Sequence, residues 1–204
     1  MSFFNTIYPL PNGISKAPEN IGGVYAFFLR FPSNLELGLL SEDVDLYRTK
    51  ELILKQLSLV ENGLKRFPLK GKLSDLKTGE HMRLNYALNA NPIARSSSVT
   101  ELSRLDVWNS FENQLMLTDM LRQSVATCKP LYVGLAEKQS IRERIISHYE
   151  LRSTFGRQVK QNNIGWDIVG FSFITVSPEY YSQKNMRTFE KLLQRLTNPI
   201  FSEL

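Results

Sequence analysis

Arg144 and His148 stand four residues apart in the segment IRERIISHY, and their types suit phosphate chemistry. On a helix, this spacing puts both side chains on one face, with Cβ atoms about 5–6 Å apart. The strand-like segment LYVGL, which contains Tyr132, comes shortly before them. A guanidinium can hold a phosphate, an imidazole can relay a proton, and a phenol with a lowered pKa can accept one. Residues 130–149 therefore predict part of a site that cleaves phosphodiester bonds.

Three short runs of aromatic and β-branched residues predict the strands that would position these groups. Each run is bounded by glycine or proline, which end strands. The runs cover residues 22–31, 131–135 and 167–176. In the last of them, Phe171, Phe173 and Thr175 alternate with Ser172, Ile174 and Val176, which is the two-residue period of a strand.

Apolar residues spaced three and four apart predict the helices. Ser140 followed by Glu143 is a capping-box pattern, and it should begin the helix that carries Arg144. The expected helices cover 42–66, 100–127 with Thr100 as its cap, 141–149 and 184–196. In the last helix, four side chains are expected to face inward, with Glu190 at the margin of that face: Met186, Phe189, Leu193 and Leu196.

Two stretches have weaker patterns. Residues 67–100 mix charges, glycines and a serine run, and we expect a loop there with a short helix near 80–90. Residues 150–166 are expected to form a long polar loop or a frayed helix. The order of elements predicts an α/β domain with a small three-stranded mixed sheet flanked by helices. We expect one domain over 1–204, with a helical insertion at 42–128.

The composition is that of an ordinary globular protein of 204 residues. Its single cysteine, Cys128, rules out an internal disulfide and gives no zinc-binding cluster. The net charge of +5 is compatible with a nucleic-acid partner without demonstrating one. The N-terminal segment lacks the pattern of a secretion signal, and the run GVYAFFLRF is too short to span a bilayer. These features predict a cytoplasmic protein with no membrane partner.

The triplets Gly23-Val24-Tyr25 and Tyr132-Val133-Gly134 resemble the two signature triplets of the GIY-YIG nuclease family. In that family a helix carrying an arginine, often with a histidine four residues later, follows the second triplet. Arg144 and His148 match this pattern. A single glutamate then lies on a later helix after the third strand, as Glu190 does here. The matching segments cover about two fifths of the chain.

The resemblance implies an endonuclease that hydrolyses DNA with Mg²⁺ or Mn²⁺. The implied catalytic residues are Tyr25, Tyr132, Arg144, His148 and Glu190, with Glu190 as the metal ligand. A carboxylate offers the oxygen that a hard cation prefers, and a guanidinium offers a planar fork for phosphate. We expect Tyr25 to be the base and Tyr132 its hydrogen-bonding partner. The size of the chain and its large insertion resemble the restriction or phage-defence branch of the family.

The chain departs from the family pattern at three places. Roughly a hundred residues separate the two tyrosines, where the family usually has a short hairpin. Ser202 stands where the family has an asparagine. Leu135 occupies a position that is often lysine or a small residue, and Lys138 is the nearest cation that could replace it.

Exposed cations are expected to contact the DNA backbone, because phosphate contacts supply most of the affinity for nucleic acids. Lys138, Arg152, Arg157 and Lys160 are the candidates near the active helix. The insertion either embraces DNA or forms a structural or dimerising layer. Its basic residues include Lys65, Arg66, Lys70, Lys72, Lys77 and Arg83.

Two other functions stay open. The chain is either a catalytically inactive nucleic-acid-binding module with the same fold, or a protein-interaction subunit that works through its helical insertion. Taken singly, each candidate site residue also has an ordinary structural explanation, such as a strand aromatic or a solvated helix charge. One active site cuts one strand, so cleavage of both strands would require a homodimer or two successive nicks.

Overall fold

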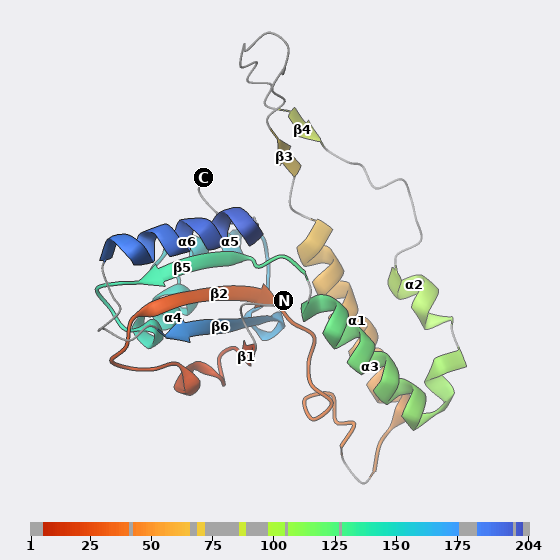
Figure 1. Ribbon diagram of the computed structural model, residues 1–204. Helices are drawn as coiled ribbons and strands as arrows, with labels where there is room; N and C mark the ends of the chain where they lie inside the picture. Colours follow the sequence, from red (N-terminus) through yellow and green to blue (C-terminus); the bar gives the residue numbers. More distant parts are fainter. Residues whose placement is uncertain are drawn as a thin grey trace.

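The structure is a computed structural model in which helices cover both faces of a sheet (Figure 1). A pair of long helices, α1 and α3, lies beyond one end of that sheet. No helix among the described residues is long and apolar enough to cross a membrane. The residues that the structure describes are 6–40, 43–65, 69–71, 86–88, 98–104, 106–126, 128–175, 183–197 and 199–201.

The main sheet has four strands in the order β1 (Tyr8–Pro9), β6 (Val169–Thr175), β2 (Gly23–Leu29) and β5 (Tyr132–Ala136). The α/β class is confirmed, but the expectation of three strands in a mixed sheet is wrong. Strand β1 was missed because it has two residues and one is a proline, which is tolerated at an edge. All neighbouring strands are antiparallel. β5 and β6 run in the same direction, but β2 lies between them, so they never pair.

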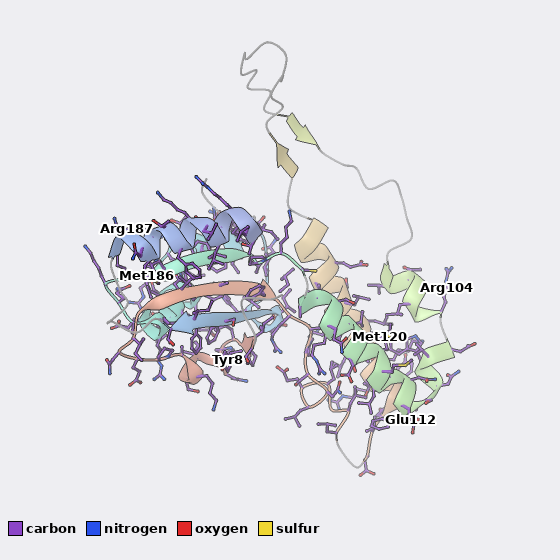
Figure 2. The ribbon with its side chains drawn as sticks, in the orientation of Figure 1. Tyr8, Arg104, Glu112, Met120, Met186 and Arg187 are labelled. Carbon is purple, nitrogen blue, oxygen red and sulfur yellow. The ribbon has the colours of Figure 1, made fainter. Side chains whose placement is uncertain are left out.

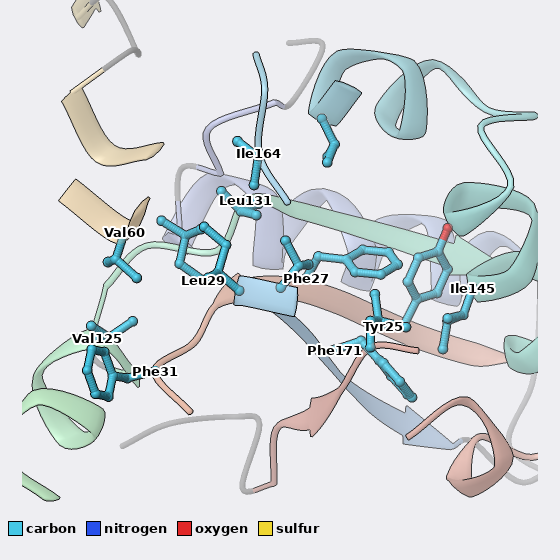
Figure 3. Close-up of a cluster of buried hydrophobic side chains, with 14 of the residues drawn as sticks. Tyr25, Phe27, Leu29, Phe31, Val60, Val125, Leu131, Ile145, Ile164 and Phe171 are labelled. Atoms are coloured by element: carbon cyan, nitrogen blue, oxygen red, sulfur yellow. The ribbon is translucent and has the colours of Figure 1, made fainter. Parts of the chain in front are cut away.

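Strand β2 is buried along its whole length, and its side chains alternate between the two faces of the sheet. Its even-numbered residues pack with Met186 and Leu193 of helix α6 (Gln183–Thr197). Its odd-numbered residues pack on the other face with residues of α4 (Ile141–Tyr149) and α5 (Thr154–Gln161). Figure 3 shows Tyr25 inside this second cluster, together with Phe27 and Ile145.

Helix α4 begins as the sequence predicts. The Ser140 side chain accepts from the backbone N–H of Glu143, and the Glu143 side chain accepts from the backbone N–H of Ser140. Helix α5 lies inside the stretch expected to be a loop or a frayed helix. Ser153 caps it by accepting from the Gly156 N–H at 3.0 Å, and a short 3₁₀ helix, Trp166–Ile168, follows. The eight residues of α5 are too few for a clear apolar period.

Helix α6 confirms the predicted terminal helix, but one side chain is not where it was expected. Met186 and Leu193 are buried, whereas Leu196 is 61% exposed. A step of three residues turns a helical side chain by about 60° from the buried line, so Leu196 lies off the packed face.

The chain between β2 and β5 holds most of the remaining elements. They are α1 (Leu46–Lys65), β3 (Leu69–Gly71), β4 (Tyr86–Leu88), α2 (Ser98–Ser103), a 3₁₀ helix (Asp106–Asn109) and α3 (Phe111–Ala126).

Two sequence expectations fail in this part of the chain. The expectation of a short helix near 80–90 is wrong for residues 86–88, which form β4 and pair with β3 in a two-stranded sheet. The rest of 80–90 lies outside the described residues. The helix expected over 100–127 is interrupted. α2 begins at Ser98 rather than being capped by Thr100, and Ser110 starts α3 afresh by accepting from the Asn113 N–H at 3.3 Å.

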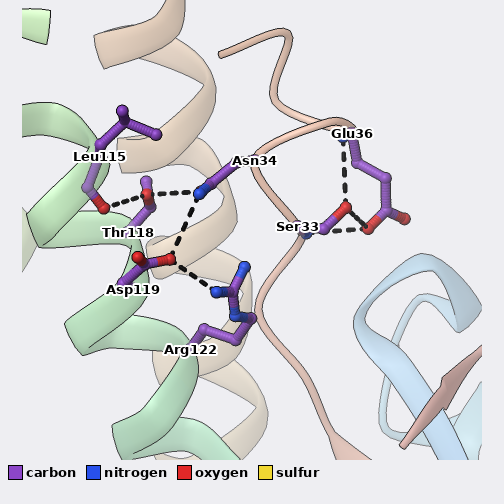
Figure 4. Close-up of polar contacts among 7 residues, drawn as sticks. All are labelled: Ser33, Asn34, Glu36, Leu115, Thr118, Asp119 and Arg122. Atoms are coloured by element: carbon purple, nitrogen blue, oxygen red, sulfur yellow. Dashed lines mark hydrogen bonds and ion pairs between the residues drawn. The ribbon is translucent and has the colours of Figure 1, made fainter. Parts of the chain in front are cut away.

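Polar contacts attach α3 to the segment that leaves β2 (Figure 4). The Thr118 hydroxyl lies 2.8 Å from Asn34 Oδ1 and 2.8 Å from the Leu115 carbonyl. The Asn34 amide donates to Asp119 at 3.3 Å, and Arg122 pairs with the same carboxylate at 2.6 Å. These contacts attach α3 to the segment after β2, in addition to the packing of Val125 in the core cluster that includes Leu29.

Candidate active site

Tyr25 and Tyr132 meet over a glycine. In the β2–β5 pairing, Tyr25 lies opposite Gly134, and Phe27 lies opposite Tyr132. A Cβ on Gly134 would lie 2.5 Å from the Tyr132 ring and 2.6 Å from the Tyr25 hydroxyl, both too close for real atoms. The ring centroids of the two tyrosines are 6.1 Å apart. The missing side chain of Gly134 therefore creates the space in which the two phenols approach each other.

His148 approaches these phenols from α4. Its Nε2 lies 2.7 Å from the Tyr25 hydroxyl, and its ring centroid is 5.3 Å from that of Tyr132. Its exposed fraction is 1%. Burial, and after it the charge of Arg144, lowers the pKa of His148 to about 3. The imidazole is therefore neutral at neutral pH.

Arg144 lies one turn before His148 on the same helix and is half-buried. Its guanidinium interacts with Tyr25, Tyr132 and Glu190. Burial raises the pKa of Tyr25 well above its ordinary range and Tyr132 raises it further, while Arg144 lowers it. The buried Nε of Arg144 has no hydrogen-bond partner among the described residues. The guanidinium thus keeps donor capacity for a group that these residues do not supply.

Glu190 reaches the cluster from α6, around the free edge of β5. The backbone N–H of Leu135 donates to its carboxylate. Gln194, one turn later, donates to the Val133 carbonyl at 3.1 Å and to Glu190 at 3.3 Å. Farther along, the Phe201 N–H donates to the Leu131 carbonyl at 2.8 Å. Helix α6 and the residues after it thus satisfy backbone groups of an edge strand, and Leu135 and Gln194 orient the Glu190 carboxylate.

A second carboxylate, Glu137, lies near Glu190. Burial raises the pKa of Glu190; Arg144 lowers it and Glu137 raises it. Glu137 is paired with Arg187 of α6 at 2.9 Å (Figure 2 labels Arg187). Among the described residues, no group of three or more acidic, histidine or cysteine side chains could hold a metal ion. A half-buried carboxylate still fits Mg²⁺, which keeps several waters and needs only one or two carboxylates beside a substrate phosphate.

The structure brings together all five side chains predicted to be catalytic, from β2, β5, α4 and α6. Arg142, the other arginine of the same segment, binds the carbonyls of Ala17 and Ser15 and pairs with Glu19. Arg142 thus anchors the N-terminal segment to α4 and does not interact with the tyrosines.

The predicted phosphate contacts are all exposed. Lys138 lies between β5 and α4, and Arg157 and Lys160 lie about one turn apart on α5. Arg152 is paired with Glu150. Ser202 lies outside the described residues, and so do the side chains of the basic cluster in the insertion: Lys65, Arg66, Lys70, Lys72, Lys77 and Arg83.

Sequence reasoning missed Ser153, whose hydroxyl contacts Nδ1 of His148. It also missed Gly156, where a Cβ would lie 2.1 Å from the His148 carbonyl oxygen, so that α5 packs directly against the end of α4. A serine before a helical run is the available signal, but the polar composition of residues 150–166 favours a loop or a frayed helix.

Comparison of the chain with protein-family models, with curated proteins and with solved structures finds no match to any of them. What the site does must therefore be inferred from its residues and their geometry.

Proposed function

We propose that this chain is a metal-dependent endonuclease that hydrolyses DNA phosphodiester bonds at a GIY-YIG-like site. The observation that carries the proposal is the meeting of two phenols, an imidazole, a guanidinium and a carboxylate over Gly134. Buried polar groups are costly when they are not fully paired, so stability alone gives little reason for such a cluster. Phosphodiester hydrolysis needs a base, a cation for the phosphate and a carboxylate for a metal, and all three are present.

Arg144 is the proposed phosphate ligand. Its guanidinium lies beside the tyrosines and Glu190, and its Nε has no partner among the described residues. A phosphate bound there would receive a charge-assisted hydrogen bond and would face the phenols. Arg144 then stabilises the negative charge that grows on the phosphate during attack by water.

One of the two tyrosines is the proposed base. Tyr25 is 0% exposed and hydrogen-bonded to His148, whereas Tyr132 is half-buried. Burial therefore favours the opposite order from the sequence expectation: Tyr132 takes the proton from the attacking water, and Tyr25 supports it. The nearby charge of Arg144 favours the phenolate form that this role requires.

Glu190 is the proposed ligand for Mg²⁺ or Mn²⁺. The Leu135 N–H and the Gln194 amide orient its carboxylate, as outer partners of a ligand commonly do. When bound, the ion would supply positive charge to stabilise the leaving oxygen and would lower the pKa of a bound water. The chain itself contributes the oriented carboxylate and the charge of Arg144.

DNA is the proposed partner, with restriction or phage defence as the proposed setting. Lys138, Arg152, Arg157 and Lys160 are exposed and supply positive charge for backbone phosphates. Cleavage of both strands would need two copies of the site, as in a homodimer.

A second candidate function rests on the helical stretch between β2 and β5. Met116 and Met120 of α3 are 56% and 59% exposed, and Tyr47 of α1 is 71% exposed. Exposed methionines and aromatics are typical of surfaces that bind other proteins. An interaction subunit, or an inactive DNA-binding module, would retain the fold without cutting.

The test is cleavage of supercoiled plasmid at low salt, with Mg²⁺, with Mn²⁺ and with a chelator. We expect wild type to nick only with metal. Glu190→Gln should abolish nicking while still accepting from the Leu135 N–H, so thermal stability should barely change. Glu112→Gln, at an exposed carboxylate of α3, is the matched control and should cut normally. Absence of cleavage of any DNA or RNA by wild type would refute the proposal; DNA binding alone would then support the inactive module.

A further inference from the structure

A buried line of hydrogen bonds runs behind the tyrosines and ends at Ser153. The Tyr25 hydroxyl contacts His148 Nε2, and His148 Nδ1 contacts the Ser153 hydroxyl. We propose that Ser153 is a positioning residue: its hydroxyl donates to Nδ1 and so holds His148 in the tautomer whose Nε2–H donates to Tyr25. The kinetic consequence rests on the proposed nuclease function, whereas the tautomer itself does not.

The first argument is the bonding capacity of Ser153. Its oxygen already accepts from the Gly156 N–H as the cap of α5. A hydroxyl has one hydrogen to give. Among the described residues, the partner left for that hydrogen is Nδ1 of His148. The opposite tautomer would place a third hydrogen at the same oxygen and leave the serine hydrogen without a partner, at a cost typical of an unmade hydrogen bond.

The second argument comes from Tyr25, at the other end of the line. Arg144 faces its oxygen, and a guanidinium can only donate. Tyr132 lies nearby, with its ring centroid 6.1 Å from that of Tyr25. When Nε2 of His148 donates to Tyr25, the single hydrogen of Tyr25 can be directed at Tyr132, whereas the opposite tautomer would direct it at His148. The tautomer that Ser153 sets is thus compatible with the Tyr25 end of the line.

Because His148 is neutral, its ring carries one proton, which lies either on Nδ1 or on Nε2. Burial and Arg144 hold its pKa at about 3, and it stays uncharged at the pH of most assays. With the tautomer fixed, every hydrogen in the line points from Ser153 toward Tyr132. Tyr132 then receives a hydrogen bond from Tyr25, which stabilises its phenolate and lets it take a proton from water. His148 acts in this line as a donor to Tyr25 and not as the acceptor of a proton.

Nitrogen NMR of histidine-labelled protein tests the tautomer directly, at about pH 8, above the ordinary histidine pKa of about 6.5. The chain has two histidines, so His81→Gln leaves the His148 signals alone in the spectrum. We expect a protonated Nε2 and a bare Nδ1 in this background. A protonated Nδ1 would overturn the proposal, whether or not the protein cuts DNA.

Two substitutions at Ser153 test its consequence, because both keep the helix cap and differ in the direction of the bond. Threonine still donates to Nδ1, whereas the aspartate carboxylate can only accept. Ser153→Thr should keep the tautomer and the wild-type kcat within about twofold, and Ser153→Asp should reverse the tautomer and lower kcat about tenfold or more, with KM nearly unchanged.

Equal effects of Thr and Asp on kcat, or an Asp variant with the wild-type tautomer, would overturn the proposal. Ser140→Ala, which removes the cap of α4 instead, is the structural control: it should leave the tautomer as it is. If wild type does not cut at all, the proposed function is refuted. The NMR measurement of the His148 tautomer still tests the role of Ser153.

Discussion

The four-stranded sheet with α4, α5 and α6, here called the sheet unit, and the helical stretch over 46–126 differ in what their buried polar side chains bond to. In the helical stretch, Gln114 is fully buried and donates to the carbonyls of Leu46 and Trp108, both at 3.0 Å. In the sheet unit, Tyr25 and His148 are as deeply buried but bond to each other. The first arrangement ties backbone segments together. The second ties side chains to one another, across β2 and α4.

This difference separates a structural polar group from a candidate chemical one. A side chain bonded to backbone carbonyls stabilises the fold by satisfying groups that would otherwise be orphaned. A buried network of side chains rigidifies a core when every member is paired and costs stability when one is not, as at Arg144 Nε. Substitutions in the helical stretch should therefore change stability alone, whereas those in the sheet unit should change activity and the response to pH.

The largest effect is expected at Gly134. Gly134→Ala should separate the two tyrosines, because its Cβ has no room beside them. We expect about 3 kcal/mol less stability and at least about 100-fold slower cleavage, measured by urea unfolding and plasmid nicking. Gly38→Ala is the comparison in the segment leading to the helices. Gly38 has φ +74° but open space around it, so this variant should lose about 1 kcal/mol and cut normally. Normal cutting by Gly134→Ala would contradict the site geometry.

A pH effect should follow from His148. Its folded pKa, about 3, lies below its unfolded value, so between about pH 6.5 and 3 only the unfolded state takes up the proton. Stability is therefore lost as pH falls, by about 2 kcal/mol at pH 5 relative to pH 7. The polar groups facing the imidazole are Tyr25 on β2, Tyr132 on β5, Arg144 on α4 and Ser153 at the start of α5.

His148→Gln isolates this contribution, because every other titrating group stays in place. Urea unfolding at the two pH values should show a smaller loss for the variant than for wild type, by about 2 kcal/mol. Equal losses in the two proteins would mean that His148 is protonated in the folded state.

A smaller effect is expected in the contacts of Figure 4. Thr118→Val keeps the shape of the side chain but removes the hydroxyl shared by Asn34 and the Leu115 carbonyl. Thermal unfolding should show a loss of about 1–2 kcal/mol, with plasmid nicking unchanged. Ser124→Ala, at an exposed hydroxyl of the same helix, should change neither. A loss of cleavage in Thr118→Val would show that the two regions are coupled.

The smallest effects are expected for the exposed cations. Arg157→Ala and Lys160→Ala should each weaken DNA binding a few-fold and reduce its salt dependence by about one phosphate contact, without changing the metal requirement. Lys129→Ala, an exposed lysine before β5, serves as a control for loss of one positive charge. If the salt dependence of DNA binding is the same in these two variants as in Lys129→Ala, α5 is not part of the proposed DNA surface.

Local patterns made much of the fold predictable. The strands at β2, β5 and β6, the capping box at Ser140 and the helix carrying Glu190 all have strong short-range signals. Strand β1 and helix α5 were missed because they are short, and their stability depends on partners distant in sequence. The direction of pairing was missed because it depends on which strand lies in the middle of the sheet.

The five candidate site residues were chosen by type and spacing, and their convergence depends on tertiary structure. Sequence reasoning gave no reason for Tyr25 to be more buried than Tyr132, because it could not show that β2 is a central strand and that Tyr132 begins an edge strand. It also could not connect Ser153 to His148, because their contact requires α5 to pack on the end of α4. Burial and hydrogen-bond direction are properties of the assembled layers.

The pairing of β2 with β5 sets few limits on the length of the chain that connects them. The two strands form an antiparallel hairpin whose loop happens to be roughly a hundred residues long. Loop-closure entropy rises only with the logarithm of length, by about 0.6 kcal/mol for each doubling, so this loop costs about 3 kcal/mol more than a tight turn. The register that brings Tyr25 opposite Gly134 is set by the strands themselves. The connection can thus change in length while the two phenols stay together, provided that residues such as Ile53, Val60 and Val125 keep their place in the core cluster.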